Sequence, residues 1–407
     1  MTTKMLAMVL AGGRGSRMDI LCNVRPKPAI SFAGGFRVID FSLSNCIHSG
    51  ITDIAVLTDY QRSNMADYLS RWRRANASTQ QFDVLEPKKV CYLGTADAVY
   101  QNIDYLRSSD ADAVLVLAGD HVYKMNYRMM AAFHEQAGAD VTVGVVTVPI
   151  EETYRFGTVK LDADSRITEF IEKSKESWSN LASMGIYIFN KQVLIDRLTE
   201  DAARPGSPHD FGYAILPEMV HRDNVFAYRF DGYWQDIGTR DTYYAANMEL
   251  LGSEPSFSLD SDWHILTEEP ELALMKKVNR GLVKNSLVSE GCVIRGEVQN
   301  SILSPEVHIE EKAIVRDSIL MPGVSVGYHT IVDRCILDEN VNISRYCYIG
   351  FDAGFPNGGR EITVVGKGTV VPSHTAIGRN CTIMPHVSPG DFKGNVVLSG
   401  TTLAPRQ

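Results

Sequence analysis

The sequence predicts an α/β protein with two domains of different architecture. The first is a Rossmann-like, mostly parallel sheet, and the second is a left-handed parallel β-helix. Three observations predict this fold class. Apolar runs alternate with amphipathic segments up to about residue 250, a 17-residue repeat occupies much of the remainder, and residues 252–280 mix proline, serine and acidic residues as linkers do. We therefore expect one domain at 1–251, a linker at 252–280 and a second domain at 281–407.

The first region reads as strands separated by helices. Its strand candidates are short apolar runs, and its helix candidates are the polar or amphipathic segments between those runs. Alternation of this kind favours an open parallel sheet covered by helices, with ligands at the carboxyl ends of the strands. The predicted strands are 5–11, 52–58, 112–118, 140–148 and 183–189, and the predicted helices include 60–76 and 126–138.

The last region repeats with a fixed short period. The segments 301–317, 318–334 and 335–350 align with a period of 17, close to three hexapeptides. Four apolar columns agree across the three copies, which favours a stacked solenoid over an antiparallel sandwich with accidental alignment. The columns are Ile302, Ile319 and Ile336; Val307, Val324 and Val341; Ile309, Val326 and Ile343; Ile314, Ile331 and Tyr348. The pattern breaks at the glycine-rich stretch 350–359 and then resumes.

Composition excludes several classes of protein. A net charge of −9 over 407 residues argues against nucleic-acid binding. Seven scattered cysteines without a C-x-x-C pair, and ten histidines without metal spacing, argue against a disulfide framework or a zinc site. No signal peptide or membrane-length apolar run is evident, so we expect a cytoplasmic protein with no membrane partner.

A glycine-rich loop, "LAGGRGSRM" at 10–18, follows the first predicted strand. It is not the dinucleotide motif G-x-G-x-x-G, since Met18 occupies the third glycine position, and no Lys-Ser or Lys-Thr completes a Walker loop. Glycines allow backbone N–H groups to approach an anion, and Arg14 and Arg17 add positive charge. The loop is therefore either a phosphate site or a plain turn with two solvated arginines.

Five segments, in the same order along the chain, resemble the ADP-glucose pyrophosphorylases, also called glucose-1-phosphate adenylyltransferases. They are "GGRGSRMDILCNVRPKPAISFAGGFRVIDFSLSNCIHSGI" (12–51), "LGTADAVYQN" (93–102), "LAGDHVYKMNY" (117–127), "FIEKSKESWSNLASMGIYIF" (170–189) and "YWQDIGTRDTYYAANMEL" (233–250). A C-terminal repeat domain is also part of the architecture of the family that these segments resemble.

The resemblance implies a reaction in which ATP and α-D-glucose 1-phosphate give ADP-glucose and pyrophosphate, for glycogen or α-glucan synthesis. It also implies Mg²⁺ as cofactor, regulation by anionic metabolites, and a homotetramer. Phosphoryl chemistry of this kind asks the protein for alignment and charge compensation. The sheet would then be the nucleotidyltransferase form of the Rossmann-like fold.

The resemblance also implies roles for individual residues. Arg17, Lys27, Asp120 and Asp236 would be catalytic, and the two aspartates would hold the metal ion. Arg25 would lie in the effector region. The nucleotide would lie against Leu10, Ala11, Gly12, Gly13, Gly15, Gly94, Thr95 and Ala96. The sugar phosphate would lie against Gly157, Glu172, Lys173, Ser183 and Gly185.

Several positions depart from the family pattern and leave alternatives open. Cys22 and Val24 replace residues that are often threonine and charged, which leaves the effector undetermined. The loop 85–94 is short where relatives contact adenine, so UDP-, dTDP- or GDP-glucose could be the product. A non-catalytic regulatory subunit is a third alternative, although Arg17, Asp120, Lys173 and Asp236, which such subunits tend to lose, are all present. An acetyltransferase activity of the repeat domain is disfavoured because no catalytic histidine is evident there.

Overall fold

A computed structural model describes residues 3–13, 15–76, 81–176, 179–259, 262–269, 271, 275–351 and 361–406. Arg14 and residues 352–359 of the predicted glycine-rich break lie outside these ranges. By packing, the chain forms two compact units, the first made of Met1–Gly13 and Ile39–Gln235 and the second of Arg14–Val38 and Asp236–Gln407. The segment 14–38 therefore packs with the C-terminal part of the chain.

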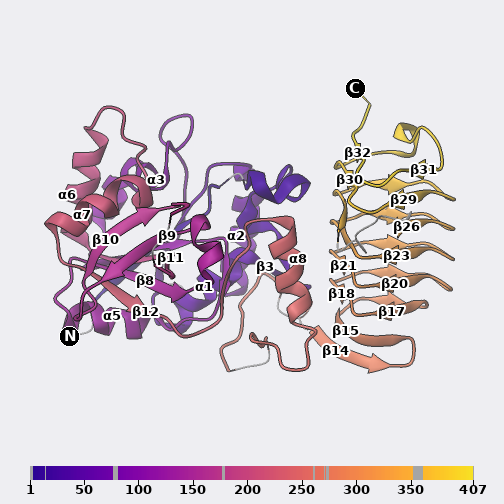
Figure 1. Cartoon of the computed structure of the whole chain (residues 1–407), viewed down its shortest axis with the longest axis horizontal. Coiled ribbons are helices and arrows are strands. Elements are labelled where there is room, and N and C mark those ends of the chain that lie inside the picture. Colours follow the sequence, from indigo (N-terminus) through magenta and orange to yellow (C-terminus); the bar gives the residue numbers. More distant parts are fainter. Residues whose placement is uncertain are drawn as a thin grey trace. The chain divides into compact units, whose positions relative to one another are not determined.

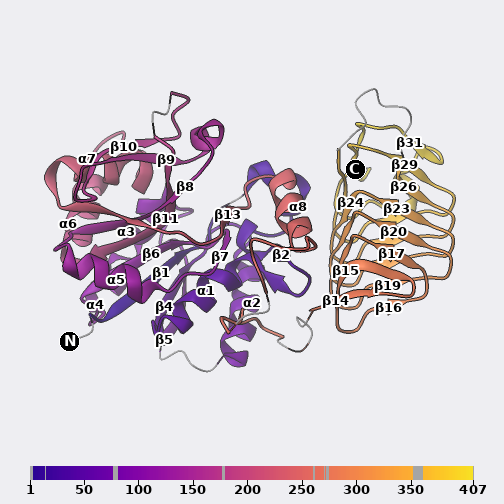
Figure 2. The same cartoon turned by 60° about the horizontal axis from the view of Figure 1, so that its bottom comes forward.

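The first unit is built on a nine-stranded mixed sheet. Its parallel centre pairs β6 (Ala113–Ala118), β1 (Met5–Leu10), β4 (Asp53–Leu57) and β5 (Gln81–Leu85) in that order. Antiparallel strands extend the other side, where β11 (Leu181–Asn190) pairs with β6. The remaining strands are β8 (Val141–Thr147), β9 (Gly157–Leu161), β10 (Ile167–Glu172) and β12 (Val225–Arg229). Figure 2 shows β6, β1 and β4 side by side.

Helices pack against this sheet and bury its apolar residues. Each of the five predicted strands is present, with ends within two residues of the prediction, because every one is a buried apolar run. The two predicted helices are α2 and α5. The first residue of α1, Val38, belongs to the second unit, and the rest of that helix to the first. The helices of the first unit are α1 (Val38–His48), α2 (Arg62–Ala75), α3 (Thr95–Gln101), α4 (Ile103–Ser108), α5 (Tyr127–Gln136), α6 (Lys191–Ala202) and α7 (Leu216–Arg222), with the 3-10 turn η3 (Ile150–Arg155) and the π-turn η4 (Phe211–Ile215).

The second unit contains a parallel β-helix whose coils stack in the order of the sequence (Figure 1). It opens with β14 (Met275–Arg280) antiparallel to β15 (Val283–Ser289), so the last residues of the predicted linker form a strand. One face is β17 (Glu297–Gln299), β20 (Ile314–Arg316), β23 (Ile331–Asp333), β26 (Tyr348–Phe351), β29 (Ala376–Gly378) and β31 (Val396–Val397). A second is β18 (Ile302–Leu303), β21 (Ile319–Leu320), β24 (Cys335–Leu337), β27 (Thr363–Val365), β30 (Thr382–Ile383) and β32 (Thr402–Leu403). The third is β16 (Val293–Ile294), β19 (His308–Ile309), β22 (Ser325–Val326), β25 (Asn342–Ile343) and β28 (Val370–Val371).

The register of these strands confirms the 17-residue period. Ile302 pairs with Ile319, which pairs with Ile336, and the columns that begin at Ile309 and Ile314 pair in the same way. The inward-facing members are buried and form one continuous core. The predicted fold class, a Rossmann-like α/β sheet followed by a parallel β-helix, is confirmed, but the sheet is mixed because β11 pairs antiparallel with β6, β8 and β9, and β10 pairs antiparallel with β9.

One corner of the solenoid carries side chains in left-handed backbone conformation. Lys312, His329, Tyr346 and His374 have φ of 60°, 55°, 57° and 63°. Their spacing brings the rings into a stack, with centroids 5.6 Å apart for His329 and Tyr346 and 5.0 Å apart for Tyr346 and His374. Ring stacking offsets part of the backbone strain at this corner.

The segment 14–38 and the helix that follows Asp236 complete the second unit. They comprise η1 (Ser16–Cys22), η2 (Lys27–Ala29), β2 (Ser31–Phe32), β3 (Phe36–Arg37) and α8 (Arg240–Glu249). Tyr243 on α8 donates its hydroxyl to the carbonyl of Ser31, and Asn247 accepts from the amide of Ala33. No helix among the described residues has the length and apolar character needed to cross a bilayer.

Candidate active site

The predicted phosphate loop lies at the carboxyl end of β1. Gly12 has no room for a side chain, because a Cβ there would lie 2.9 Å from the Cβ of Asp59. Gly15 adopts a φ of 63° immediately before η1, and a Cβ there would lie 2.6 Å from the sulfur of Cys22. Gly13 and Arg17 are exposed. Gly12 and Gly15 are thus too crowded for a side chain, and the described part of the loop exposes Gly13 and Arg17, as the predicted anion site requires.

Lys27 and Asp236 form a buried ion pair in the second unit. The Lys27 Nζ lies 2.8 Å from Asp236 Oδ1, and the two side chains are only 7% and 9% exposed. Lys27 is held in η2, the short turn between Pro26 and Ile30. A buried ammonium ion is costly unless an opposite charge pairs with it, and here the Asp236 carboxylate is that partner. The two predicted catalytic residues therefore fix each other's position.

Asp120 and His121 follow β6, at its carboxyl end. The His121 Nε2 lies 3.4 Å from Asp120 Oδ1, and its ring packs edge-on against Trp234 at 5.0 Å. The strand β7 (His121–Tyr123) pairs with β13 (Trp234–Asp236). Among the described residues, Asp120, His121 and Asp236 each offer one ligand atom, and these atoms lie within 4.8 Å of one another. Two carboxylates and an imidazole at this spacing fit a divalent cation.

The "GTADA" segment is docked on residues 208–213. The amides of Ala96 and Asp97 donate to the His209 carbonyl at 3.0 and 3.1 Å. Gly94 lies so close that a Cβ would be 2.4 Å from that same oxygen. Thr95 donates its hydroxyl to Asp210 Oδ2 at 2.8 Å. These contacts fix the start of α3, where the predicted nucleotide residues lie.

Asp97 orients its own loop. Its Oδ2 accepts from the amide of Leu93 at 2.8 Å and from Gln101 Nε2 at 2.6 Å. The carboxylate is buried, so it supports the turn before α3 from inside the protein. Asp97 therefore orients the loop that leads into α3.

Glu172 and Lys173 form an ion pair at the end of β10. Glu172 Oε1 and Lys173 Nζ are 2.8 Å apart, and the glutamate side chain is 13% exposed whereas that of the lysine is 44% exposed. Burial raises the pKa of Glu172, which Lys173 only partly offsets. Burial alone would lower the pKa of Lys173, but Glu172 raises it, so the ammonium stays charged at neutral pH. The pair presents one half-exposed cation to solvent.

Two glycines make room for Glu172. A Cβ at Gly157 or at Gly212 would lie 2.5 Å from Glu172 Oε2. Ser183 is buried on β11 and accepts from the amide of Gly185, which has a φ of 66°. Tyr187, also on β11, is buried in the core. The structure therefore brings Gly157 to Glu172, and Ser183 to Gly185.

Arg25 is buried in an ion-pair network with the solenoid. Its Nη2 lies 2.5 Å from Asp338 Oδ1 and its Nη1 lies 3.3 Å from Glu339 Oε1. Arg37 and Lys367 also reach Glu339, at 3.4 and 2.8 Å. The Arg25 side chain is 4% exposed. The guanidinium predicted for the effector region is thus enclosed by carboxylates of its own chain.

Several residues of the site were missed by sequence reasoning. Asp210 caps η4 by accepting from the amides of Gly212 and Tyr213. His121 joins the two aspartates, and Asp338 and Glu339 hold Arg25. The stretch "HDFG" offered a local signal, since an aspartate before a turn is a common cap. The acidic pair in the repeat offered none.

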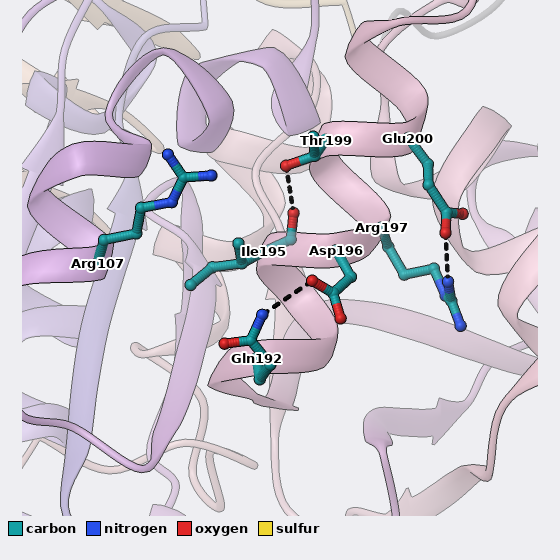
Figure 3. A pocket seen from close by; sticks show the side chains of 7 residues that line it. All are labelled: Arg107, Gln192, Ile195, Asp196, Arg197, Thr199 and Glu200. Atoms are coloured by element: carbon teal, nitrogen blue, oxygen red, sulfur yellow. Dashed lines mark hydrogen bonds and ion pairs between the residues drawn. The ribbon is translucent and has the colours of Figure 1, made fainter.

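A separate hollow lies along α4 and α6 in the first unit (Figure 3). It contains none of the predicted site residues. Arg197 is bonded there to Glu200, and Gln192 to Asp196, so its charges largely neutralise one another. The lining residues are Arg107, Gln192, Ile195, Asp196, Arg197, Thr199 and Glu200.

The fold and the site together define a nucleotidyl transferase with an appended hexapeptide solenoid. The nucleotidyl transferase family model matches residues 6–253, and the GlmU-like C-terminal hexapeptide family model matches residues 271–371. These matches fall on the α/β sheet with its glycine-rich loop and on the first coils of the β-helix.

Comparison with curated relatives identifies one family within this class of transferases. The chain is 43% identical to a glucose-1-phosphate adenylyltransferase of Thermomicrobium roseum, over 98% of this chain and 97% of the relative. It is 40% identical to that of Acetivibrio thermocellus, over 96% and 95%. It is 41% identical to that of Methylococcus capsulatus, over 86% and 89%. The chain belongs to the glucose-1-phosphate adenylyltransferase family.

Proposed function

We propose that this protein joins ATP and α-D-glucose 1-phosphate to give ADP-glucose and pyrophosphate. A phosphate oxygen of the sugar phosphate attacks the α-phosphorus of ATP, and the bond from that phosphorus to the β-phosphate oxygen breaks. The observation that carries the proposal is the likeness to adenylyltransferases along nearly the whole chain. No proton needs to be removed, because the attacking phosphate is already ionised.

The substrates are assigned to two groups of residues. The triphosphate lies against the loop of Gly12, Gly13 and Gly15, with Arg17 and Lys27 countering its charge. Leu10, Ala11 and the segment Gly94–Ala96 hold the nucleoside side. The support is the crowding at Gly12 and Gly15 near the end of β1 and the buried position of Lys27.

The sugar phosphate is assigned to Glu172 and Lys173. The half-exposed ammonium of Lys173 binds the phosphate, and the Glu172 carboxylate accepts from sugar hydroxyls. Gly157, Ser183 and Gly185 form the adjoining wall. The support is the fixed ion pair at the end of β10. Holding both anions in place removes most of the entropic cost of their encounter.

Mg²⁺ is the proposed metal ion, held by Asp120 and Asp236. Carboxylate oxygens suit this cation, and when bound it would neutralise charge on phosphate oxygens. His121 is a candidate third ligand, although an imidazole is a softer donor than Mg²⁺ usually takes. Manganese titration against magnesium, followed by turnover, distinguishes the two metals.

Base selectivity is the sharpest test of the proposal. The purified chain is assayed with glucose 1-phosphate and ATP, UTP, dTTP or GTP in turn. ATP is expected to give the highest kcat/KM. A tenfold preference for another nucleotide, about 1.4 kcal/mol, would replace the adenylyl assignment. Absence of turnover with all four would favour the regulatory-subunit alternative.

Regulation, assembly and location complete the proposal. Anionic metabolites are proposed effectors, to be added in the same assay as fructose bisphosphate, fructose 6-phosphate, pyruvate or phosphate. A homotetramer is proposed, and light scattering on the full chain measures its mass. The product serves glycogen or α-glucan synthesis in the cytoplasm. We also keep the proposed division into a domain at 1–251, a linker at 252–280 and a domain at 281–407.

A further inference from the structure

Tyr213 presents an aromatic ring to solvent beside the proposed sugar-phosphate residues. The residue is 54% exposed, whereas Phe211 in the same turn is buried at 1%. The Lys173 Nζ lies 5.5 Å from the centroid of the Tyr213 ring. Lys173 is the cation assigned to the phosphate of glucose 1-phosphate. The exposed Tyr213 ring beside it therefore lies next to the place assigned to the sugar that this phosphate carries.

The ring belongs to a backbone that is fixed relative to Glu172 and Lys173. Asp210 Oδ1 accepts from the amides of Gly212 and Tyr213 at 2.9 and 3.1 Å. A side chain at Gly212 would meet the Glu172 carboxylate at 2.5 Å, so that carboxylate lies directly against the turn. The position of the ring is thus set by the same groups that hold the ion pair.

The chemistry of glucose matches such a ring. In glucopyranose the ring hydroxyls at C2, C3 and C4 are equatorial, which leaves axial C–H groups on both faces of the sugar. Aromatic side chains offer a large apolar surface with a polar tip, and they pack well against apolar faces of this size. An axial hydroxyl, as at C4 of galactose or C2 of mannose, interrupts one of those faces.

We propose that Tyr213 is a specificity-determining residue whose ring packs against the glucose ring of glucose 1-phosphate. This inference rests on the proposed function, since it takes Lys173 to bind the sugar phosphate. Tyr213 binds no reacting atom in this arrangement, so it acts on sugar recognition and leaves the nucleotide side unchanged.

The test is steady-state kinetics of the full-length protein with glucose 1-phosphate, galactose 1-phosphate and mannose 1-phosphate. Tyr213→Ala is expected to raise KM for glucose 1-phosphate about tenfold and KM for ATP less than about twofold. It should also lower the glucose-over-galactose ratio of kcat/KM by about tenfold. Tyr213→Phe keeps the ring and should stay within about threefold of the wild type in all constants.

The controls separate the possible failures. Tyr213→Leu keeps apolar bulk without a ring and serves if the alanine variant does not fold. Tyr346→Ala removes an exposed tyrosine of the solenoid and should leave both KM values unchanged. An equal rise in KM for ATP, or an unchanged sugar preference, overturns the inference while wild-type activity leaves the proposed function standing. An inactive wild type overturns both.

Discussion

The ion pairs around Glu339 allow a quantitative prediction for the substitution Glu339→Gln. Burial alone would raise the pKa of this carboxyl, but the two arginines and the lysine outweigh burial and lower it from 4.5 to about 2. Each pKa unit corresponds to about 1.4 kcal/mol, so the ionised carboxylate contributes about 3 kcal/mol to the folded state. The side chain is 10% exposed, so solvent screens this contribution little.

The sign of the pH dependence follows from the depressed pKa. The folded-state value lies below the unfolded one, so the stabilisation is fully present above about pH 4.5 and is lost as the pH falls towards 2. Urea unfolding of wild type and Glu339→Gln is measured between about pH 3 and about pH 7, which covers the plateau and the upper part of that window. The difference in free energy of unfolding should be about 3 kcal/mol at neutral pH and should shrink steadily below pH 4.5.

A matched control lies on the surface of the same solenoid. Glu310 pairs with Arg295 at 3.2 Å, but its side chain is 46% exposed. Glu310→Gln should cost less than about 1 kcal/mol and should show little pH dependence. If Glu339→Gln costs no more than Glu310→Gln, or if its cost is the same at pH 3 and pH 7, then the network around Arg25 does not stabilise the fold as argued.

Three further substitutions test the proposed site. Asp120→Asn should lower turnover about a hundredfold or more with an unchanged circular dichroism spectrum, and near-normal turnover would remove it from the metal site. Lys173→Gln should raise KM for glucose 1-phosphate about tenfold while KM for ATP changes little; an equal effect on both substrates would contradict the assignment. Gly15→Ala should lower the free energy of unfolding by about 1–3 kcal/mol, because its φ is 63° and its Cβ would meet Cys22. Gly13→Ala, where no atom lies within 4 Å of the added Cβ, is the control, and equal thermal shifts in the two alanine variants would show that crowding is not the cause.

Local patterns predicted the strands and the solenoid well. Strands such as β1 and β6 are continuous buried runs, and a run of this kind is visible in the sequence itself. The solenoid register follows from a period, so Ile302, Ile319 and Ile336 could be aligned before any coordinate was known. Both signals need only neighbours in the chain or a constant spacing.

Contacts between distant segments could not be predicted in this way. Arg25 and Asp338 are 313 positions apart, and nothing near either one marks the other as its partner. The same holds for Thr95 and Asp210, which are separated by 115 positions. The motifs predict which residues bear the chemistry, and that assignment stays a prediction, whereas the contacts that orient these residues depend on three-dimensional packing.

The placement of Arg14–Val38 with Asp236–Gln407 has a consequence for exchanging parts between relatives. A hybrid joined near residue 252 would combine the Arg25 of one parent with the acidic pair of another. If the donor lacks carboxylates equivalent to Asp338 and Glu339, a buried guanidinium is left uncompensated, a defect that typically costs several kcal/mol. Workable hybrids should therefore take the segment around Arg25 and the solenoid coil that contains Asp338 and Glu339 from the same parent, although the two segments lie far apart in the sequence.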